Sequence, residues 1–288
     1  MDLQTEITWL GISFGYIAVG FALVLLSKFL KDLLTPYRLD VELSHKDNVA
    51  LGLAITGYFA GVLIIFLGAA VGPSPDEVPQ LSVLGMELAQ TLLYAVVGIV
   101  MLNFSSFLID KMVLYKFSMR KEIIEDRNVG TGAVEAGCLV ANGLVIAGAI
   151  HGDGDFATAV VFYLLGQVVL ILFGLFYQWI TSYDIHHEIE EDNVAAGVSL
   201  GFGMAAIGII LLKSTFGDFI SWEHNLAMFG IYAGTGFVTL MIVRKIVDVA
   251  ILPRTTLHHE IVEDRNLNAA LLEGTLSVGG AAAILLIF

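Results

Sequence analysis

The sequence predicts an all-α, polytopic membrane protein with eight transmembrane helices in two tandem four-helix halves. Of its 288 residues, 57% are apolar and 15% are charged, and the mean hydropathy is +0.83. Soluble domains average roughly 45–50% apolar and about 25% charged residues, so a soluble chain of this composition could not cover its surface with polar groups. Apolar stretches alternate with short charged clusters, which is the pattern of a multi-pass membrane protein. The composition therefore excludes a soluble enzyme.

The eight predicted spans are runs long enough to cross about 30 Å of hydrocarbon. They lie near residues 7–30, 48–71, 82–109, 128–150, 157–181, 193–213, 226–248 and 267–288. The connections after the odd-numbered spans, with their flanks, carry thirteen of the 14 Lys and Arg residues, and the opposite side has Lys213. The positive-inside rule then places these connections on the cytoplasmic side of a bacterial-type inner membrane. Both termini are then expected outside, in the periplasm.

Four similar segments precede the even-numbered spans, which indicates internal repetition. Each segment contains acidic residues and ends in asparagine: Val41–Asn48, Lys121–Asn128, His187–Asn193 and His259–Asn266. The first and third continue as Asp-Asn-Val-Ala, and the second and fourth contain Glu-Asp-Arg-Asn. The chain therefore divides into two related halves, 1–150 and 151–288, of two helical hairpins each. Because every hairpin has two spans, the copies share one orientation.

The repeated asparagines suit the starts of helices. An asparagine side chain can accept a hydrogen bond from an amide of the first helical turn, and nearby acids favour the positive end of the helix dipole. The same segments would also form a cytoplasmic edge able to dock a soluble protein partner. Besides Asn128 and Asn266, the residues of this edge are Asn48, Asn193, Asp47, Asp192, Glu42, Glu122, Glu188 and Glu260.

The Glu-Asp-Asn-type entry into a glycine-rich span, in units of four spans with external termini, resembles the family called domain of unknown function 350, the YjfL-like bacterial inner-membrane proteins. Two tandem copies cover nearly the whole chain. The resemblance implies an integral membrane protein, with an association to envelope-stress systems. It supplies no catalytic residues, because the family has no assigned activity.

Two acidic residues fall deep inside predicted spans, away from the span ends. Glu135 and Glu273 each follow the asparagine of their segment by seven residues, which places them two turns, or about 10 Å, deeper in the bilayer. An ionised carboxylate there costs at least ~2.5–3.5 kcal/mol, so each is expected to face protein or water and to have a partner. In the fourth span a polar stripe continues to Asn142. The residues of the predicted ion pathway are Glu135, Glu273, Asn128, Asn266 and Asn142.

Histidines form a second candidate site on the cytoplasmic side. His186-His187-Glu188 and His258-His259-Glu260 occupy equivalent positions in the two halves. Imidazole and carboxylate groups together suit zinc or a similar transition ion. The metal-ligand hypothesis therefore names His186, His187, His258 and His259.

These observations lead to three functional hypotheses. The leading one is a cation- or proton-conducting channel or transporter lined by the two glutamates. The alternatives are a membrane scaffold in envelope-stress response and a transition-metal transporter. No nucleophile or nucleotide motif appears, so we expect no enzyme, and the ligand that the candidate sites suit is a cation or a divalent metal. The net charge of −14 argues against nucleic acid, and the sequence leaves open whether copies of the chain assemble in the bilayer.

Overall fold

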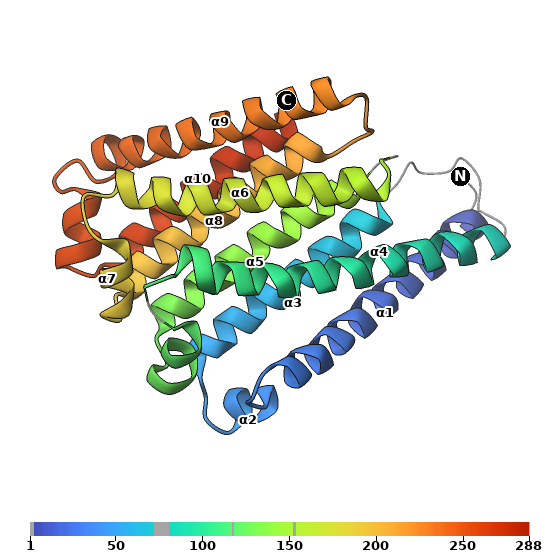
Figure 1. Ribbon diagram of the computed structural model, residues 1–288, viewed down its shortest axis with the longest axis horizontal. Helices are drawn as coiled ribbons and strands as arrows, with labels where there is room; N and C mark the ends of the chain where they lie inside the picture. The colour runs from blue at the N-terminus through green and yellow to red at the C-terminus, as the bar shows by residue number, and fades with distance from the viewer. Residues whose placement is uncertain (1–2, 72–80, 117, 152–153, 288) are drawn as a thin grey trace.

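A computed structural model describes residues 3–71, 81–116, 118–151 and 154–287, and within these ranges the regular structure is helical (Figure 1). Eight of the described helices are long and apolar enough to cross a membrane, which confirms the predicted spans. They are α1 (Leu3–Leu34), α3 (Val49–Ala70), α4 (Leu81–Leu108), α5 (Val129–Ile150), α6 (Phe156–Ile180), α8 (Val194–Thr215), α9 (Trp222–Ile246) and α10 (Leu267–Ile287).

Shorter helical segments join the spans. Two π-helical turns, η1 (Ile109–Val113) and η3 (Val247–Ile251), extend α4 and α9. Four others each lead into an even-numbered span: α2 (Leu39–Ser44), η2 (Lys121–Asp126), α7 (Ile185–Glu190) and η4 (His259–Glu263). We call these four the entry turns and the side of the bundle that holds them the repeat edge. The chain thus consists of four units, each made of an odd-numbered span, an entry turn and an even-numbered span.

The eight spans form two layers. In the inner layer α3, α5, α8 and α10 lie side by side in chain order, as the colours from blue to red show in Figure 1. In the outer layer three of the helices each lie over a groove between two inner helices. Helix α4 packs on α3 and α5, α6 packs on α5 and α8, and α9 packs on α8 and α10. Helix α1 packs mainly on α3.

Small residues hold the inner helices at close range, since without a side chain two backbones can approach until they touch. A Cβ atom added at Gly143 of α5 would lie 2.6 Å from the Cα of Gly61 in α3. One added at Gly208 of α8 would lie 2.5 Å from the Cα of Ala141 in α5. The inner layer therefore depends on glycine at its helix crossings.

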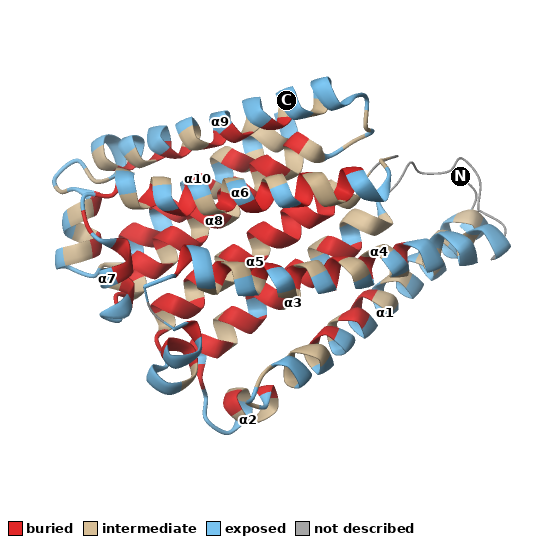
Figure 2. Ribbon diagram, in the orientation of Figure 1, coloured by how far each residue is buried: buried red, intermediate tan, exposed pale blue. Residues whose placement is uncertain are grey.

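Burial follows this arrangement with one exception (Figure 2). The most apolar stretch is 56% buried in α3 and in α5 and 72% buried in α8, as expected for glycine-rich spans that pack inside. In α10 the value is 28%, the same as in the outer helix α9. Helix α10 is therefore less buried than the other three inner helices. The reason is its place at the end of the inner row, where it has an inner-layer neighbour on one side.

Candidate functional sites in the membrane and at the repeat edge

Glu273 lies in a closed ring of polar groups, which we call the second-half cluster. One carboxylate oxygen, Oε1, accepts a hydrogen bond of 2.6 Å from Nη1 of Arg244 on α9, and the other accepts one from the Ser199 hydroxyl on α8. The Ser199 oxygen lies 2.5 Å from the hydroxyl of Tyr177 on α6, which is 3.2 Å from the same Arg244 nitrogen. The Arg244 and Glu273 side chains are 13% and 6% exposed, so this ion pair is largely shielded from the surroundings.

Glu135 lies in a looser cluster of the same kind, the first-half cluster. The hydroxyl of Ser106 on α4 donates to Glu135 Oε1 over 3.4 Å, and Nζ of Lys31 on α1 is 3.5 Å from that hydroxyl. The Lys31 ammonium also sits 4.8 Å from the ring centre of Tyr58 on α3. In the second half, the Arg244 guanidinium similarly lies 5.6 Å from the ring of Tyr177. Each half of the chain therefore combines a membrane-embedded carboxylate with a cation, a serine and a tyrosine.

The two clusters are related by the duplication but obtain their cations differently. When Asn128 is aligned with Asn266, Ser106 falls on the position of Arg244. The first half thus has a hydroxyl where the second half has a guanidinium, and Lys31 supplies the positive charge from α1 instead. In the inner layer α8 lies between α5 and α10, so the two glutamates do not meet in a shared seam.

The polar stripe of the fourth span divides between two neighbouring helices. Asn142 is fully buried and accepts a hydrogen bond of 2.6 Å from Gln167 of α6, whereas Glu135 contacts Ser106 of α4. The Asn142 amide also donates to the carbonyl of Cys138, one turn back. Although the spacing places these residues on related turns of α5, their contacts lie on opposite outer-layer neighbours.

At the repeat edge, each of the first three asparagines makes the same two contacts. The side-chain oxygens of Asn48, Asn128 and Asn193 accept hydrogen bonds from the third residue of the helix they begin, at 3.1, 3.0 and 3.2 Å. Their side-chain amides donate to a carbonyl of the next entry turn. The pairs are Asn48 with Ile123 at 2.8 Å, Asn128 with Ile189 at 2.6 Å and Asn193 with Ile261 at 2.7 Å. One residue type therefore both caps a helix and joins consecutive units.

A backbone feature at all four units positions these asparagines. The preceding residue is left-handed in each unit, with φ of 49° at Asp47, 57° at Arg127, 58° at Asp192 and 48° at Arg265. Aspartate tolerates this conformation, whereas for arginine it is a strained one. The turn lets the backbone N–H of each asparagine donate a hydrogen bond to the backbone carbonyl of the entry-turn glutamate, at distances of 2.7–3.1 Å. Asp47 and Asp192 thus shape the backbone of the repeat edge.

The side chains of the first glutamates in the entry turns make contacts within their own units. Glu122, Glu188 and Glu260 accept hydrogen bonds from the asparagine amides of their own units, and Glu42 pairs with Lys46 at 2.6 Å. Glu42 and Glu122 are each 3% exposed. Burial raises the pKa of Glu122, and the hydrogen bond from Asn128 opposes this rise. These two acids are therefore part of the packing of the edge, not groups presented to a soluble partner.

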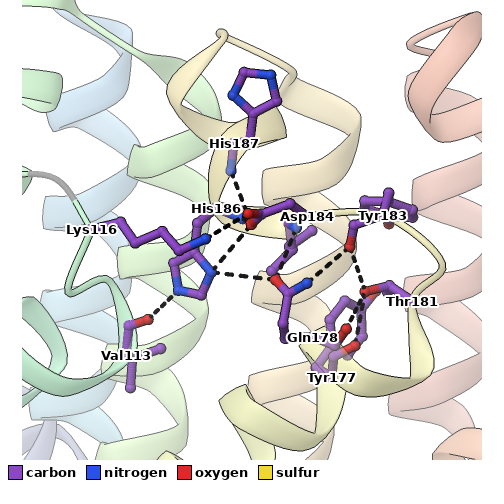
Figure 3. A network of polar contacts seen from close by, with 10 residues as sticks. Val113, Lys116, Tyr177, Gln178, Thr181, Tyr183, Asp184, His186 and His187 are labelled. Carbon is purple, nitrogen blue, oxygen red and sulfur yellow. Dashed lines mark hydrogen bonds and ion pairs between the residues drawn. The ribbon is translucent and has the colours of Figure 1, made fainter.

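The four candidate histidines make separate contacts. His186 is buried, with Nε2 2.8 Å from the carbonyl oxygen of Val113 and Nδ1 3.3 Å from Gln178, whereas His187 extends away from that network (Figure 3). His258 contacts the Ser182 hydroxyl, and His259 pairs with Glu263 at 3.0 Å. Among the described residues, no group of three histidine, cysteine or acidic side chains converges as a metal ion requires.

Figure 3 shows instead that Asp184 and His186 connect the third unit to the second unit. Lys116, which follows η1 in the second unit, bonds Asp184 of the third at 2.5 Å, and Asp184 caps α7. The hydrogen bond from the Lys116 ammonium holds the pKa of the Asp184 carboxyl below its usual range. His186 contributes its contact to Val113 of η1 beside this ion pair. The buried imidazole thus has a packing and hydrogen-bonding role.

The double role of Asn128 leads to a prediction. At an ordinary helix start aspartate caps as well as asparagine. In Asn128→Asp the cap acceptor remains, but the donors to Ile189 and Glu122 are lost and a negative charge is added beside Glu122. We expect this variant to lose about 1–3 kcal/mol of unfolding free energy, at least as much as Asn128→Ala, because buried acceptors lose their donors. Unfolding titrations in detergent micelles measure this loss.

The control for this prediction is Ser221→Asp, which changes the exposed cap of α9, where the side chain accepts from His224. Because aspartate and serine cap comparably, we expect a change within about 0.5 kcal/mol. If Asn128→Asp were as stable as the unmodified protein, the bonds between units would contribute nothing to stability.

Comparisons with known proteins agree with this architecture. The model of the family described as Domain of Unknown Function (DUF350) matches two tandem segments, residues 5–150 and 153–287. This chain belongs to the DUF350 family. The tandem DUF350 chain is also 23% identical over 265 residues to a protein described as a UPF0719 transmembrane protein from Aquifex aeolicus (strain VF5), covering 90% of this chain and 93% of the relative. No solved structure matches it. It is therefore a multi-pass membrane protein of an uncharacterised family.

The sequence interpretation missed the partners of both intramembrane glutamates. It assigned Arg244 and Lys31 to the cytoplasmic flanks and did not single out Tyr177, Ser199 or Ser106. In the structure α9 continues without a break into η3, so Arg244 lies inside a span of residues 222–251. A usable signal was the spacing itself, because Arg244 precedes the end of this helix by two turns, at the position of Ser106 in the first half.

Proposed function

We propose that this DUF350 chain conducts protons or small cations across the membrane at two separate sites, the first-half and second-half clusters. The observation that supports this proposal is a carboxylate at the same place in each half, bonded to a serine hydroxyl, with a cation in the same cluster. A charged residue inside a membrane span is costly and is a functional candidate by default. No covalent chemistry is involved, so the proposed role is transport and not catalysis.

The proposed role of each carboxylate is to exchange its cation partner for the transported one. At Glu273, arrival of a proton or metal cation on the carboxylate would release Arg244 toward Tyr177, which already lies 3.2 Å from the guanidinium. At Glu135, Lys31 would retain its contact with the Tyr58 ring while Ser106 remains as hydrogen-bond donor. In this proposal the repeat edge faces the cytoplasm, because it is on the side that carries thirteen of the 14 Lys and Arg residues.

The test is ion flux into proteoliposomes, followed with an internal pH dye for protons and with ion-sensitive dyes for sodium, potassium and divalent cations. The variants are Glu135→Gln, Glu273→Gln and the double variant. Because the clusters are separate, we expect each single variant to lose about half of the flux and the double variant to lose all of it. The matched control is Glu87→Gln, which removes an exposed carboxylate from α4 and is expected to leave flux unchanged.

Several outcomes would overturn this proposal. Equal flux in the unmodified protein and in a well-folded double variant would exclude the carboxylates, and complete loss in one single variant would exclude two independent sites. Absence of flux for every ion tested would exclude transport.

Exposed acids of the repeat edge favour the second candidate, a scaffold that docks a soluble partner with a basic face. These acids are Glu125, Asp126, Glu190, Glu191, Glu263 and Asp264, all exposed to solvent. Charge reversal of these residues, and not of buried Glu42 or Glu122, would abolish such docking while leaving flux unchanged. This candidate gains support if flux is absent and a partner is released by the reversal.

A further inference from the structure

The contacts between consecutive inner helices follow one rule at the first two junctions of the chain, and a contact at the third junction follows it too. Positions are counted from the asparagine of each unit, which is position zero. Position two of one inner helix faces position four of the next helix, position nine faces position eight, and position thirteen faces position fifteen. Between α3 and α5 these pairs are Ala50 with Gly132, Gly57 with Ala136, and Gly61 with Gly143. Between α5 and α8 they are Gly130 with Gly197, Gly137 with Gly201, and Ala141 with Gly208. At the third junction Phe202 of α8 meets Gly274 of α10 in the nine-to-eight pair.

The two helices at the ends of the inner row, α3 and α10, each have one face whose contact positions have no neighbouring inner helix within the described chain. On α10 the residues at positions two, nine and thirteen are Asn268, Thr275 and Gly279, and all three are exposed. A Cβ atom added at Gly279 would meet nothing within 4 Å. On α3 the residues at positions four, eight and fifteen are Gly52, Thr56 and Leu63, of which Thr56 and Leu63 are exposed.

The hydrogen bonds at the repeat edge stop at the same two places. Asn48, Asn128 and Asn193 each donate to the entry turn of the following unit, whereas the Asn266 amide donates to Glu260 of its own unit. The carbonyl that corresponds to Ile123, Ile189 and Ile261 in the first unit belongs to Leu43. No hairpin unit precedes it within residues 1–288, so within the described chain no asparagine of an earlier unit reaches it.

The outer layer shows the same gap. Helices α4, α6 and α9 each lie over a groove between two inner helices, but α1 lies mainly against α3. Its most apolar stretch is 17% buried, compared with 28–39% for the other three outer helices. An inner helix placed beside α3 would complete the groove under α1.

We infer that copies of this chain assemble head to tail, with α10 of one copy packed against α3 of the next. The occupant is a second copy because the two open surfaces carry the two sets of positions that meet at each of the three internal junctions. With Thr56 and Thr275 at the nine-to-eight pair, the two helices lie further apart than at the glycine crossings. Asn266 then donates to the Leu43 carbonyl of the next copy, and Leu63 enters the space beside Gly279. Such a contact is heterologous, so repeating it produces a ring if the rotation closes and a row if it does not. This inference is independent of the proposed transport.

Disulfide trapping in native membranes tests the contact. The background is Cys138→Ala, which removes the one cysteine of the sequence, and differently tagged chains carrying Thr56→Cys or Thr275→Cys are produced together. These positions form the eight-to-nine pair, and their internal counterparts are in direct contact. We expect a crosslink that joins the two tags. The control combines Thr56→Cys with Thr235→Cys, an exposed threonine on α9, and is expected to give none.

Three results would overturn the inference: no crosslink between the two tags, equal crosslinking in the control, or efficient crosslinking of Thr275→Cys with itself, which indicates a symmetric α10–α10 contact. Adding Asn266→Asp provides a second measurement, because aspartate keeps the cap acceptor but has no amide to donate to Leu43. It is expected to lower the yield of the mixed crosslink without unfolding the chain. An unchanged yield would show that the Asn266 bond is not part of the contact.

Discussion

Replacing Arg244 with methionine is expected to lower the unfolding free energy by about 3–5 kcal/mol, because Glu273 would remain buried without its cation. The Glu273 side chain is 6% exposed, and Arg244 contributes a hydrogen bond of 2.6 Å to Oε1. The remaining donor to this carboxylate among its described contacts is the Ser199 hydroxyl. Unfolding titrations in detergent micelles, followed by circular dichroism, measure the loss.

Two further variants separate the ion pair from a general effect on α9. Lys245→Met removes the neighbouring charge, which is exposed, and is expected to change stability by less than about 0.5 kcal/mol. The double variant Arg244→Met/Glu273→Leu removes both buried charges and is expected to recover most of the lost stability, since an apolar pair of similar volume often replaces a buried ion pair without cost. If Arg244→Met behaved like Lys245→Met, the ion pair would not stabilise the fold.

Gly137→Ala is expected to be the second severe substitution, with a loss of about 1–3 kcal/mol or more. Its added methyl group would collide with the backbone of Gly201, where α5 crosses α8 in the middle of the inner layer. Backbone atoms of a packed helix cannot move aside as the end of a flexible side chain can, so the two helices must separate along the crossing. Thermal denaturation in micelles, together with the elution profile on size exclusion, reports this change.

The matched control is Gly230→Ala on α9, where an added Cβ atom meets nothing within 4 Å. Alanine favours a helix over glycine by about 1 kcal/mol, so this variant should be neutral or more stable. The same intrinsic preference acts in Gly137→Ala, and the difference between the two variants therefore isolates the helix contact. Equal stability of both variants would show that the close approach of α5 and α8 is not needed.

Much of the fold follows from local properties of the chain. Hydropathy is sufficient to place eight spans, because crossing a bilayer demands a long apolar helix wherever it occurs. The repeated segments are sufficient to place the four helix starts, because the cap of Asn48, Asn128 or Asn193 involves an amide only three residues away. The depth of Glu135 and Glu273 follows from their helical spacing. Each of these inferences needs only neighbouring residues.

The candidate sites were predicted in part. Glu135 and Glu273 were expected to have partners, but which residues these are depends on how the helices pack. Lys31 reaches the first cluster from α1 through Ser106 on α4, and Tyr177 and Ser199 reach the second from α6 and α8. The hypothesis of one pathway lined by both carboxylates did not take account of α8, which lies between α5 and α10.

What the tertiary structure alone decided is the pairing of groups that are distant in the chain. Asn48, Asn128 and Asn193 each make a second contact, from the side-chain amide to a carbonyl of the next entry turn. No local sequence pattern predicts this hydrogen bond, because its distance is set by two helices that pack at glycine crossings. The exposure of α10 likewise depends on its place at the end of a row and not on its composition, which resembles that of the buried spans. Local sequence specifies each helix and its start, because helical hydrogen bonds and helix caps join residues only a few positions apart. Packing determines the order of the helices, the partners of the buried charges and the open ends of the row. Each of these contacts joins residues that are distant in the chain, so it depends on how all the intervening helices are placed.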